Sequence, residues 1–178
     1  MGLYDDKTRK TTLAQSLLEG KQSFEDIGCN LSTIAERLMG NEDLMKLLIH
    51  TSKDAEELPL TEEQIQNAFG DQIRIVPAIR KDEGIKNYVI VQFGGFAPVP
   101  KTDYKSYIIT FDIICNIDNW MMKDYTPRPY KIMSQVNKLM NQTKIDSLGP
   151  VSFLGAQNLV INEELSGFTL SYGVMTEM

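Results

Sequence analysis

The sequence predicts an α+β fold, with an antiparallel or mixed sheet of about four to five strands packed by helices on one face. Three observations support this prediction. Apolar residues recur at helical spacing through residues 31–70, and the pattern changes to the two-residue alternation of strands from Gln72 onward. One amphipathic helix then separates the first strands from the last two. The order is therefore helices, strands, helix and strands, with no internal repeat.

Length and composition are those of one ordinary globular domain. The chain has 178 residues, of which 42% are hydrophobic and 24% charged, so it can build a core and is unlike a disordered chain. The net charge of −6 argues against a nucleic-acid-binding protein with a broad basic surface. No apolar run reaches the about 18 residues of a membrane span, so we expect no membrane contact. The two cysteines, Cys29 and Cys115, indicate no disulfide framework and favour a reducing compartment.

Residues 1–30 differ from the rest and are predicted to form an N-terminal arm, followed by one α+β domain over residues 31–178. The arm has one weakly amphipathic stretch, in which Leu13, Leu17 and Leu18 stand at helical spacing. Three apolar anchors are too few for a stable isolated helix. We expect the arm either to be flexible or to become ordered against a partner subunit.

The helical segment that opens the domain, residues 31–50, is expected as one kinked helix or as two short helices, because a Gly-Asn pair interrupts its apolar stripe. Asn41 is placed to cap the second of these helices, with acidic residues in the first turn. A charged linker follows. Residues 61–70 then form a short helix, which begins with a capping box of Thr61 and Gln64 and ends at a glycine.

The strand pattern begins with residues 72–80, where Pro77 predicts an edge strand or a break in the strand. Residues 87–93 form the second predicted strand, and residues 94–103 are a connection rich in glycine and proline. The clearest strand is 105–117, which alternates strictly and is apolar on part of both faces. We therefore expect this strand to be central, with helices on one side.

The last predicted helix, residues 129–143, follows a linker that contains Pro127. Pro129 lies in the first turn of the helix, where a proline costs little stability. The two prolines restrict the linker and so reduce the entropy lost when it contacts a neighbour. Two final strands, 153–161 and 167–175, are separated by a link short enough for an antiparallel hairpin.

Sequence motifs for catalysis and for metal binding are missing. One histidine, His50, and two distant cysteines cannot form a zinc site of the usual spacing. There is no phosphate-binding glycine-rich loop and no nucleophile elbow. We therefore expect no cofactor, no metal and no enzymatic activity. His50 is instead typical of a polar residue at the end of a helix.

A less favoured alternative is a small metal-dependent nuclease that uses Asp82, Asp103 and Lys105. Such an enzyme needs carboxylates to hold a divalent ion and a lysine near the attacked phosphate. The spacing is common, and Asp103 is more typical of a turn and Lys105 of a charge at a sheet edge. A ligand-binding regulatory module is a further alternative.

Several residues are candidates for contact with another subunit or with a cylindrical partner. Asp112 lies in the middle of a strand, where it either faces solvent or pairs with a base across a contact. Arg128 and Lys131 either form a cationic lip at the start of a helix or serve solubility. The apolar tripeptide 120–122 belongs either to the core or to an interface. The candidate set is Phe96, Asp112, Trp120, Met121, Met122, Arg128 and Lys131.

Four stretches together resemble the tail-terminator and neck proteins of long-tailed bacteriophages. They are LSTIAERLMGNEDLMKLLIHTSKDAEELPLTEEQ, SYIITFDIICN, TPRPYKIMSQVNKLM and GPVSFLGAQNLVINEELSGFTLSYGVM, so the resemblance spans residues 31–175. It implies a curved sheet packed by helices. It also implies a ring, usually hexameric, that caps the last ring of the tail tube, ends its polymerisation and offers a docking surface to the head connector.

The same resemblance implies the partners and the location. The partners would be copies of the chain itself, the tail tube protein and the head-tail connector proteins, in the neck of a virion assembled in the host cytoplasm. Genomic DNA would pass through the lumen without specific binding, which an acidic protein suits. The loop 94–104 and the segment 118–128 would be candidate contacts, and the helix 129–143 would brace the sheet. The adjacent head-completion ring is the alternative within this resemblance.

Overall fold

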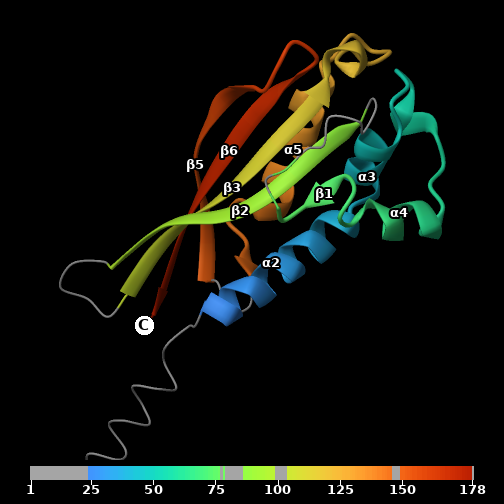
Figure 1. Cartoon of the computed structure of the whole chain (residues 1–178). Helices are drawn as coiled ribbons and strands as arrows, with labels where there is room; N and C mark the ends of the chain where they lie inside the picture. The colour runs from blue at the N-terminus through green and yellow to red at the C-terminus, as the bar shows by residue number, and fades with distance from the viewer. Residues whose placement is uncertain (1–23, 77, 79–85, 99–103, 146–148, 178) are drawn as a thin grey trace, which may run out of the picture.

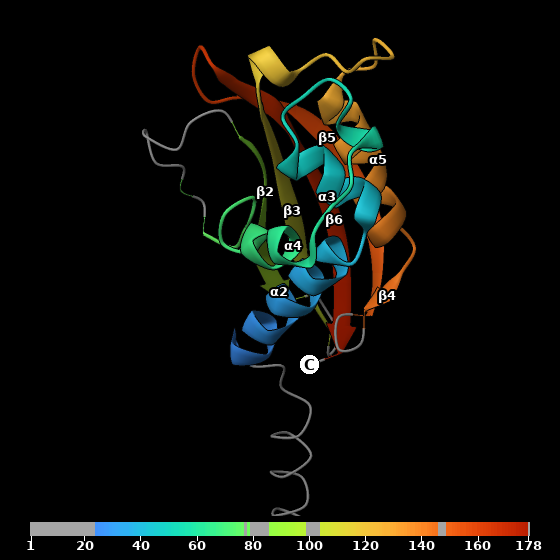
Figure 2. The same cartoon turned by 90° about the vertical axis from the view of Figure 1, so that its right-hand side faces the viewer.

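A curled sheet carries the described helices on one of its faces (Figures 1 and 2). The computed structural model describes residues 24–76, 78, 86–98, 104–145 and 149–177. The helices are α2 (Phe24–Met39), α3 (Glu42–Ile49), α4 (Glu62–Ala68) and α5 (Arg128–Met140). The strands are β1 (Ile73–Arg74), β2 (Asn87–Pro98), β3 (Tyr104–Asn116), β4 (Lys144–Ile145), β5 (Gly149–Val160) and β6 (Leu165–Glu177).

The sheet is mixed and has six strands in the order β1-β2-β3-β6-β5-β4. Among the described strands, β1 and β2 run parallel and every other neighbouring pair is antiparallel. The predicted α+β class, with a curved sheet packed by helices, is confirmed. β1 falls within the predicted first strand, and the count exceeds the expected four to five because of β4, a two-residue edge strand too short to show a periodic pattern.

The helical opening consists of two helices and not of one kinked helix. The Asn41 side chain accepts a hydrogen bond from the Leu44 N–H at 2.8 Å and so caps α3, as predicted. The capping box of Thr61 and Gln64 at the start of α4 is also confirmed. α2 begins at Phe24, within the segment assigned to the arm, and the remainder of that arm lies outside the described residues.

Strand β3 is central, as its pattern predicts. Alternate side chains from Tyr107 to Cys115 are buried beneath the helices, and Phe111 packs edge-on against Tyr172 of β6. β2 continues past Phe93 to Pro98, so residues predicted as a connection belong to a strand. A bulge between Gly94 and Ala97 accommodates them.

The first strand lies at a sheet edge, as its proline predicts, but it is shorter than expected. β1 ends at Arg74, whose guanidinium donates to the carbonyl oxygens of Asp71 and Ala78 and stacks 4.8 Å from the centre of the Tyr88 ring. These contacts turn the chain away from the sheet after two paired residues. Pro77, which motivated the prediction of a break, lies outside the described residues.

Gly167 on β6 is a point of close approach between strands. A Cβ atom at this position would lie 1.8 Å from the Ile113 carbonyl oxygen of β3, which is far inside van der Waals contact. We expect Gly167→Ala to lower the free energy of unfolding by about 2–3 kcal/mol, because the central pair of strands must separate to admit the methyl group. Urea unfolding followed by circular dichroism measures this loss. Gly28→Ala is the control, since nothing lies within 4 Å of its added Cβ, and an equal effect of both substitutions would contradict the prediction.

The two cysteines are expected to differ in reactivity. Burial raises the pKa of the Cys115 thiol to about 12, so little thiolate forms near neutral pH. Cys29 is exposed. We expect a thiol reagent such as DTNB to label one cysteine per native chain and both after denaturation. Native labelling that persists in Cys29→Ser would show that Cys115 is accessible.

Candidate assembly interface

Strand β5 forms one long side of the sheet, and another strand covers only its beginning. β4 pairs with β5 at Gly149 and Pro150, and no other described strand lies on this side. Figure 1 shows β5 running along the outside of the sheet, away from β1 at the opposite edge. Most of the length of β5 is therefore an open sheet edge, which is a template for pairing with a further strand.

At its start, the outer side of β5 is hydrogen-bonded. The Val151 N–H donates to the Thr143 carbonyl oxygen at 3.0 Å, and the Phe153 N–H donates to the Asn141 side-chain oxygen at 3.1 Å. Both acceptors lie in or next to the turn that follows α5. In this part of β5, the backbone N–H and C=O groups of odd-numbered residues thus point outward, away from β6. Those of the even-numbered residues point toward β6.

Beyond Phe153 the outer backbone groups are open. A bulge after Phe153 shifts the alternation by one residue. From here on, the backbone N–H and C=O groups of Ala156, Asn158 and Val160 point outward. Among the described residues, none donates to or accepts from the backbone groups of these three. Their side chains are exposed, with Val160 at 73% of its full accessible surface. The edge therefore presents three N–H groups and three carbonyl oxygens to solvent.

Exposed apolar side chains border the open edge. Phe153 is 44% exposed and Leu154 is 59% exposed, although both belong to a strand. Natural proteins commonly blunt an exposed edge with lysine, proline or another charge, and residues 151–161 contain none of these. We define the β5 surface as the outer edge of residues 153–161 together with the exposed apolar side chains beside it: Tyr130, Phe153, Leu154, Val160 and Ile161.

Next to the β5 surface lies the sheet face that no described helix covers. Its centre is a polar band, aligned across four strands, which consists of Gln92, Thr110, Asp112, Gln157, Thr169 and Ser171. Asp112 accepts a hydrogen bond from the Thr169 hydroxyl at 2.6 Å and one from the Gln92 amide at 3.0 Å. Asp112 is thus held by neighbours on the same face, and both of these hydrogen-bond donors are uncharged.

The predicted contact segment 120–122 is divided between core and surface. Met122 is buried at 3% exposure, and Trp120 packs against the core from a half-buried position. Met121 is 41% exposed and is the one residue of the three that remains available to a partner. For Trp120 and Met122 the alternative of a core role, left open by the sequence, is the one that the structure supports.

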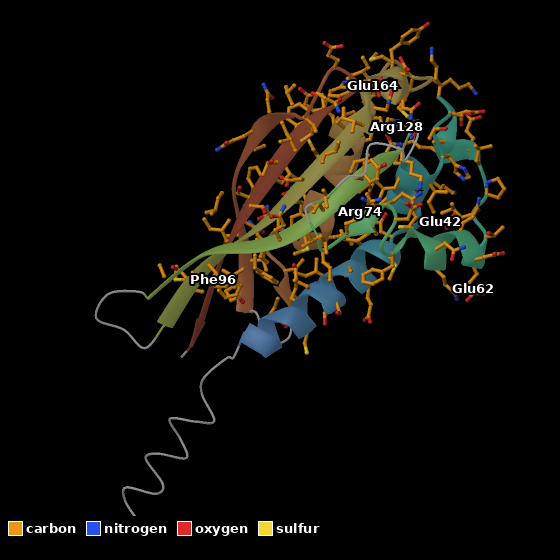
Figure 3. The ribbon with its side chains drawn as sticks, viewed as in Figure 1. Glu42, Glu62, Arg74, Phe96, Arg128 and Glu164 are labelled. Atoms are coloured by element: carbon orange, nitrogen blue, oxygen red, sulfur yellow. The ribbon has the colours of Figure 1, made fainter. Side chains whose placement is uncertain are left out.

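Arg128 serves neither of the roles left open by the sequence, a cationic lip or a charge for solubility. Its side chain is fully buried, and the guanidinium donates to four backbone carbonyl oxygens, those of Leu47, His50, Ser52 and Asn119. Burial lowers the pKa of Arg128, and no described carboxylate lies within ion-pair distance. Figure 3 shows Arg128 between α3 and the sheet. The residue joins the end of α3 to the start of α5, so interface contact by this side chain is excluded in the described conformation.

Lys131 lies near the surface but is engaged within the chain. Its ammonium group pairs with Glu56 at 2.5 Å and with Asp124 at 2.7 Å, and its side chain is 18% exposed. Burial alone would lower the pKa of Lys131, but the hydrogen bonds to these carboxylates outweigh it and raise the pKa. The hydrogen bond with Lys131 in turn lowers the pKa of Asp124. Through these two ion pairs, Lys131 links the segment before α5, which contains Asp124, to the linker after α3, which contains Glu56.

Phe96 lies at the far end of the sheet from the β5–β6 turn. Figure 3 shows it at the lower end of β2, opposite Glu164. It is 46% exposed, and its ring centre lies 5.8 Å from that of Tyr107. Phe96 therefore remains a candidate for contact, separate from the β5 surface.

The residues of the nuclease alternative are largely outside the described part of the chain. Asp82 and Asp103 belong to segments that the structure does not describe, and of Lys105 only the backbone position in β3 is described. Within the described ranges, no three His, Cys, Asp or Glu side chains gather as metal ligands. Across the same ranges, no helix has the length and apolar character needed to cross a membrane.

Sequence reasoning did not place the β5 surface among the candidates. A signal was available, because residues 151–161 lack any charge and any proline although they alternate as a strand. Whether such a strand is central or at an edge depends on the strand order, which no local pattern records.

No curated protein matches the chain. A protein-family model described as YomW matches residues 41–174, which include α3 and most of β6 and cover well over half of the 178 residues. The family indicates a phage-associated protein, and it does not specify a position in the virion. The chain belongs to the YomW family.

Proposed function

We propose that this chain is a structural protein of a phage tail and forms a hexameric ring at the head-proximal end of the tail. The ring ends polymerisation of the tail tube and joins the tail to the head connector. Its partners are copies of itself, the tail tube protein and the connector proteins. Genomic DNA passes through its lumen without specific binding, and the chain acts without catalysis in the neck of a virion assembled in the host cytoplasm.

The β5 surface is the observation that carries this proposal. It combines an open, uncharged sheet edge with exposed apolar side chains, and such edges pair with other chains. If β5 contacts a different surface of the next copy, the contact is heterologous. Heterologous contacts that repeat around an axis close into rings. The shape of the fold therefore suits a subunit that is completed by its neighbour.

Two further facts support the placement in a tail. The family is phage-associated, which agrees with a virion component. The net charge of −6 also suits a channel wall along which DNA slides and does not adhere, because like charges repel the phosphate backbone.

Electron microscopy of tails from the phage that encodes this chain tests the proposal. We expect the chain at the head-proximal end of each tail, in one ring. Tubes assembled without the chain should vary in length and exceed the normal length, because nothing stops their growth. Absence of the chain from purified tails, together with unchanged tube length, would overturn the proposal.

The adjacent head-completion ring is the alternative, and the same preparation distinguishes it. A terminator stays with tails that have been purified without heads. A head-completion protein instead stays with filled heads that lack tails, and its loss leaves the length of the tube unchanged.

A further inference from the structure

We propose that the β5 surface is occupied by the N-terminal segment of a neighbouring copy, which adds to the sheet as an antiparallel strand beside β5. This inference rests on the proposed ring, since it names the element that each copy passes to the next. Residues 1–23 precede α2 and provide enough chain, because strands in globular proteins are usually about five or six residues long. An extended segment can pair with the open backbone groups of β5 along their whole length, which side chains alone cannot do.

Charge complementarity favours this occupant. Lys7, Arg9 and Lys10 form a basic group directly after Asp5 and Asp6, so residues 5–10 carry a net charge of +1 in a chain whose total is −6. The turn that joins β5 to β6 exposes Glu163 and Glu164 at the end of the open edge. Opposite charges at the end of an apolar contact set its register and speed the encounter between the partners. The basic group of one copy is therefore placed at the acidic turn of the next.

The direction of the chain agrees with this placement. β5 ends at the turn that carries Glu164, at the upper end of the molecule in Figure 3, and α2 begins at the opposite end in Figures 1 and 2. A strand that starts at the turn and runs antiparallel to β5 leaves at that lower end. The proposal places β5 along the ring axis. All copies in a cyclic ring then point the same way along that axis, so the α2 of the neighbour begins at the same lower end. A strand parallel to β5 would end at the upper turn, far from the start of α2.

The residues that would lie beside β5 suit an apolar edge. Residues 11–16 carry no charge, as is true of residues 151–161. Thr11 and Thr12 are β-branched and favour strands. The competing helix has only three leucines as anchors, too few to be stable alone. The sequence therefore provides no strong helical tendency to compete with pairing to β5.

Charge reversal in the full-length chain tests the proposal. We expect Lys7→Glu/Arg9→Glu/Lys10→Glu to weaken self-association about tenfold, and Glu163→Lys/Glu164→Lys to do the same. Mixing the two variants should restore association to within about threefold of the unmodified chain, because the pairing is between copies. Sedimentation velocity at low ionic strength measures this, with the chain alone and with purified tail tubes.

The matched control is Glu62→Lys/Glu63→Lys, an exposed acidic pair on α4 that the proposal leaves unpaired with any neighbour. It should change association less than threefold. Equal weakening by the control and by the turn variant would overturn the proposal, as would the absence of rescue on mixing. Urea unfolding of each variant excludes misfolding as the cause. The chain could still form rings on tail tubes while neither charge reversal changes self-association. In that case the proposed ring stands, and only the identity of the inserted strand is wrong.

Discussion

Replacing Arg128 with methionine is expected to lower the free energy of unfolding by about 3–5 kcal/mol. The guanidinium donates to carbonyl oxygens of Leu47, His50, Ser52 and Asn119, and methionine leaves all four without this donor. Each buried acceptor left unsatisfied costs about 1–3 kcal/mol, and partial access of water to the loop keeps the total below the sum. The charge itself is tolerated because the last carbonyls of α3 form the negative end of its helix dipole.

Arg128→Lys is the matched control for this substitution. The ammonium group keeps the charge, but it cannot reach the four carbonyl oxygens that the planar guanidinium spans, so we expect an intermediate loss of stability. Urea unfolding measures the loss directly, and thermal unfolding should show a decrease in the midpoint of about 10 °C for Arg128→Met. A methionine variant within about 1 kcal/mol of the unmodified chain would show that the four carbonyls find water or other donors.

Replacing Asn158 with proline is expected to abolish self-association without unfolding the chain. The Asn158 N–H faces outward from β5, where no described group accepts it, so its removal breaks no hydrogen bond within the subunit. Proline is tolerated on an edge strand whose N–H faces solvent, but it cannot donate to an added strand, and its ring blocks close approach. We expect association to weaken by at least about a hundredfold, while the stability of the subunit changes by less than about 1 kcal/mol.

The control variants separate pairing from folding. Asn158→Thr keeps the N–H group and favours the strand, so it should associate as the unmodified chain does. Gln157→Pro removes an N–H that faces β6 and should destabilise the subunit itself. Light scattering and urea unfolding, applied to all three variants, resolve these effects. Normal assembly of Asn158→Pro would show that the edge of β5 is not a contact.

Local signals in the sequence predicted the features that depend on neighbouring residues. The cap at Asn41 and the capping box at Thr61 involve side chains and N–H groups three residues apart, so a short window contains all the information. The central place of β3 followed from apolar residues on both of its faces. The fold class could be predicted from these elements and their order.

Features that depend on distant backbone groups could not be predicted in the same way. The partners of Arg128 include carbonyl oxygens 76 to 81 residues earlier in the chain, and a carbonyl has no signature in the sequence. The sequence therefore suggested a surface cation where the fold has a buried one. Likewise, Met121 and Met122 are chemically identical, and only the position of the loop buries one and exposes the other.

The mass of the assembled chain tests the central claim most directly, namely that the subunit is completed by copies of itself. Native mass spectrometry of the chain, alone and after release from purified tail tubes, should show one closed oligomer of defined stoichiometry in at least one of these conditions. The same measurement on Asn158→Pro should show monomers only. A chain that remains monomeric in both conditions, with tube binding identical in the proline variant, would contradict the account.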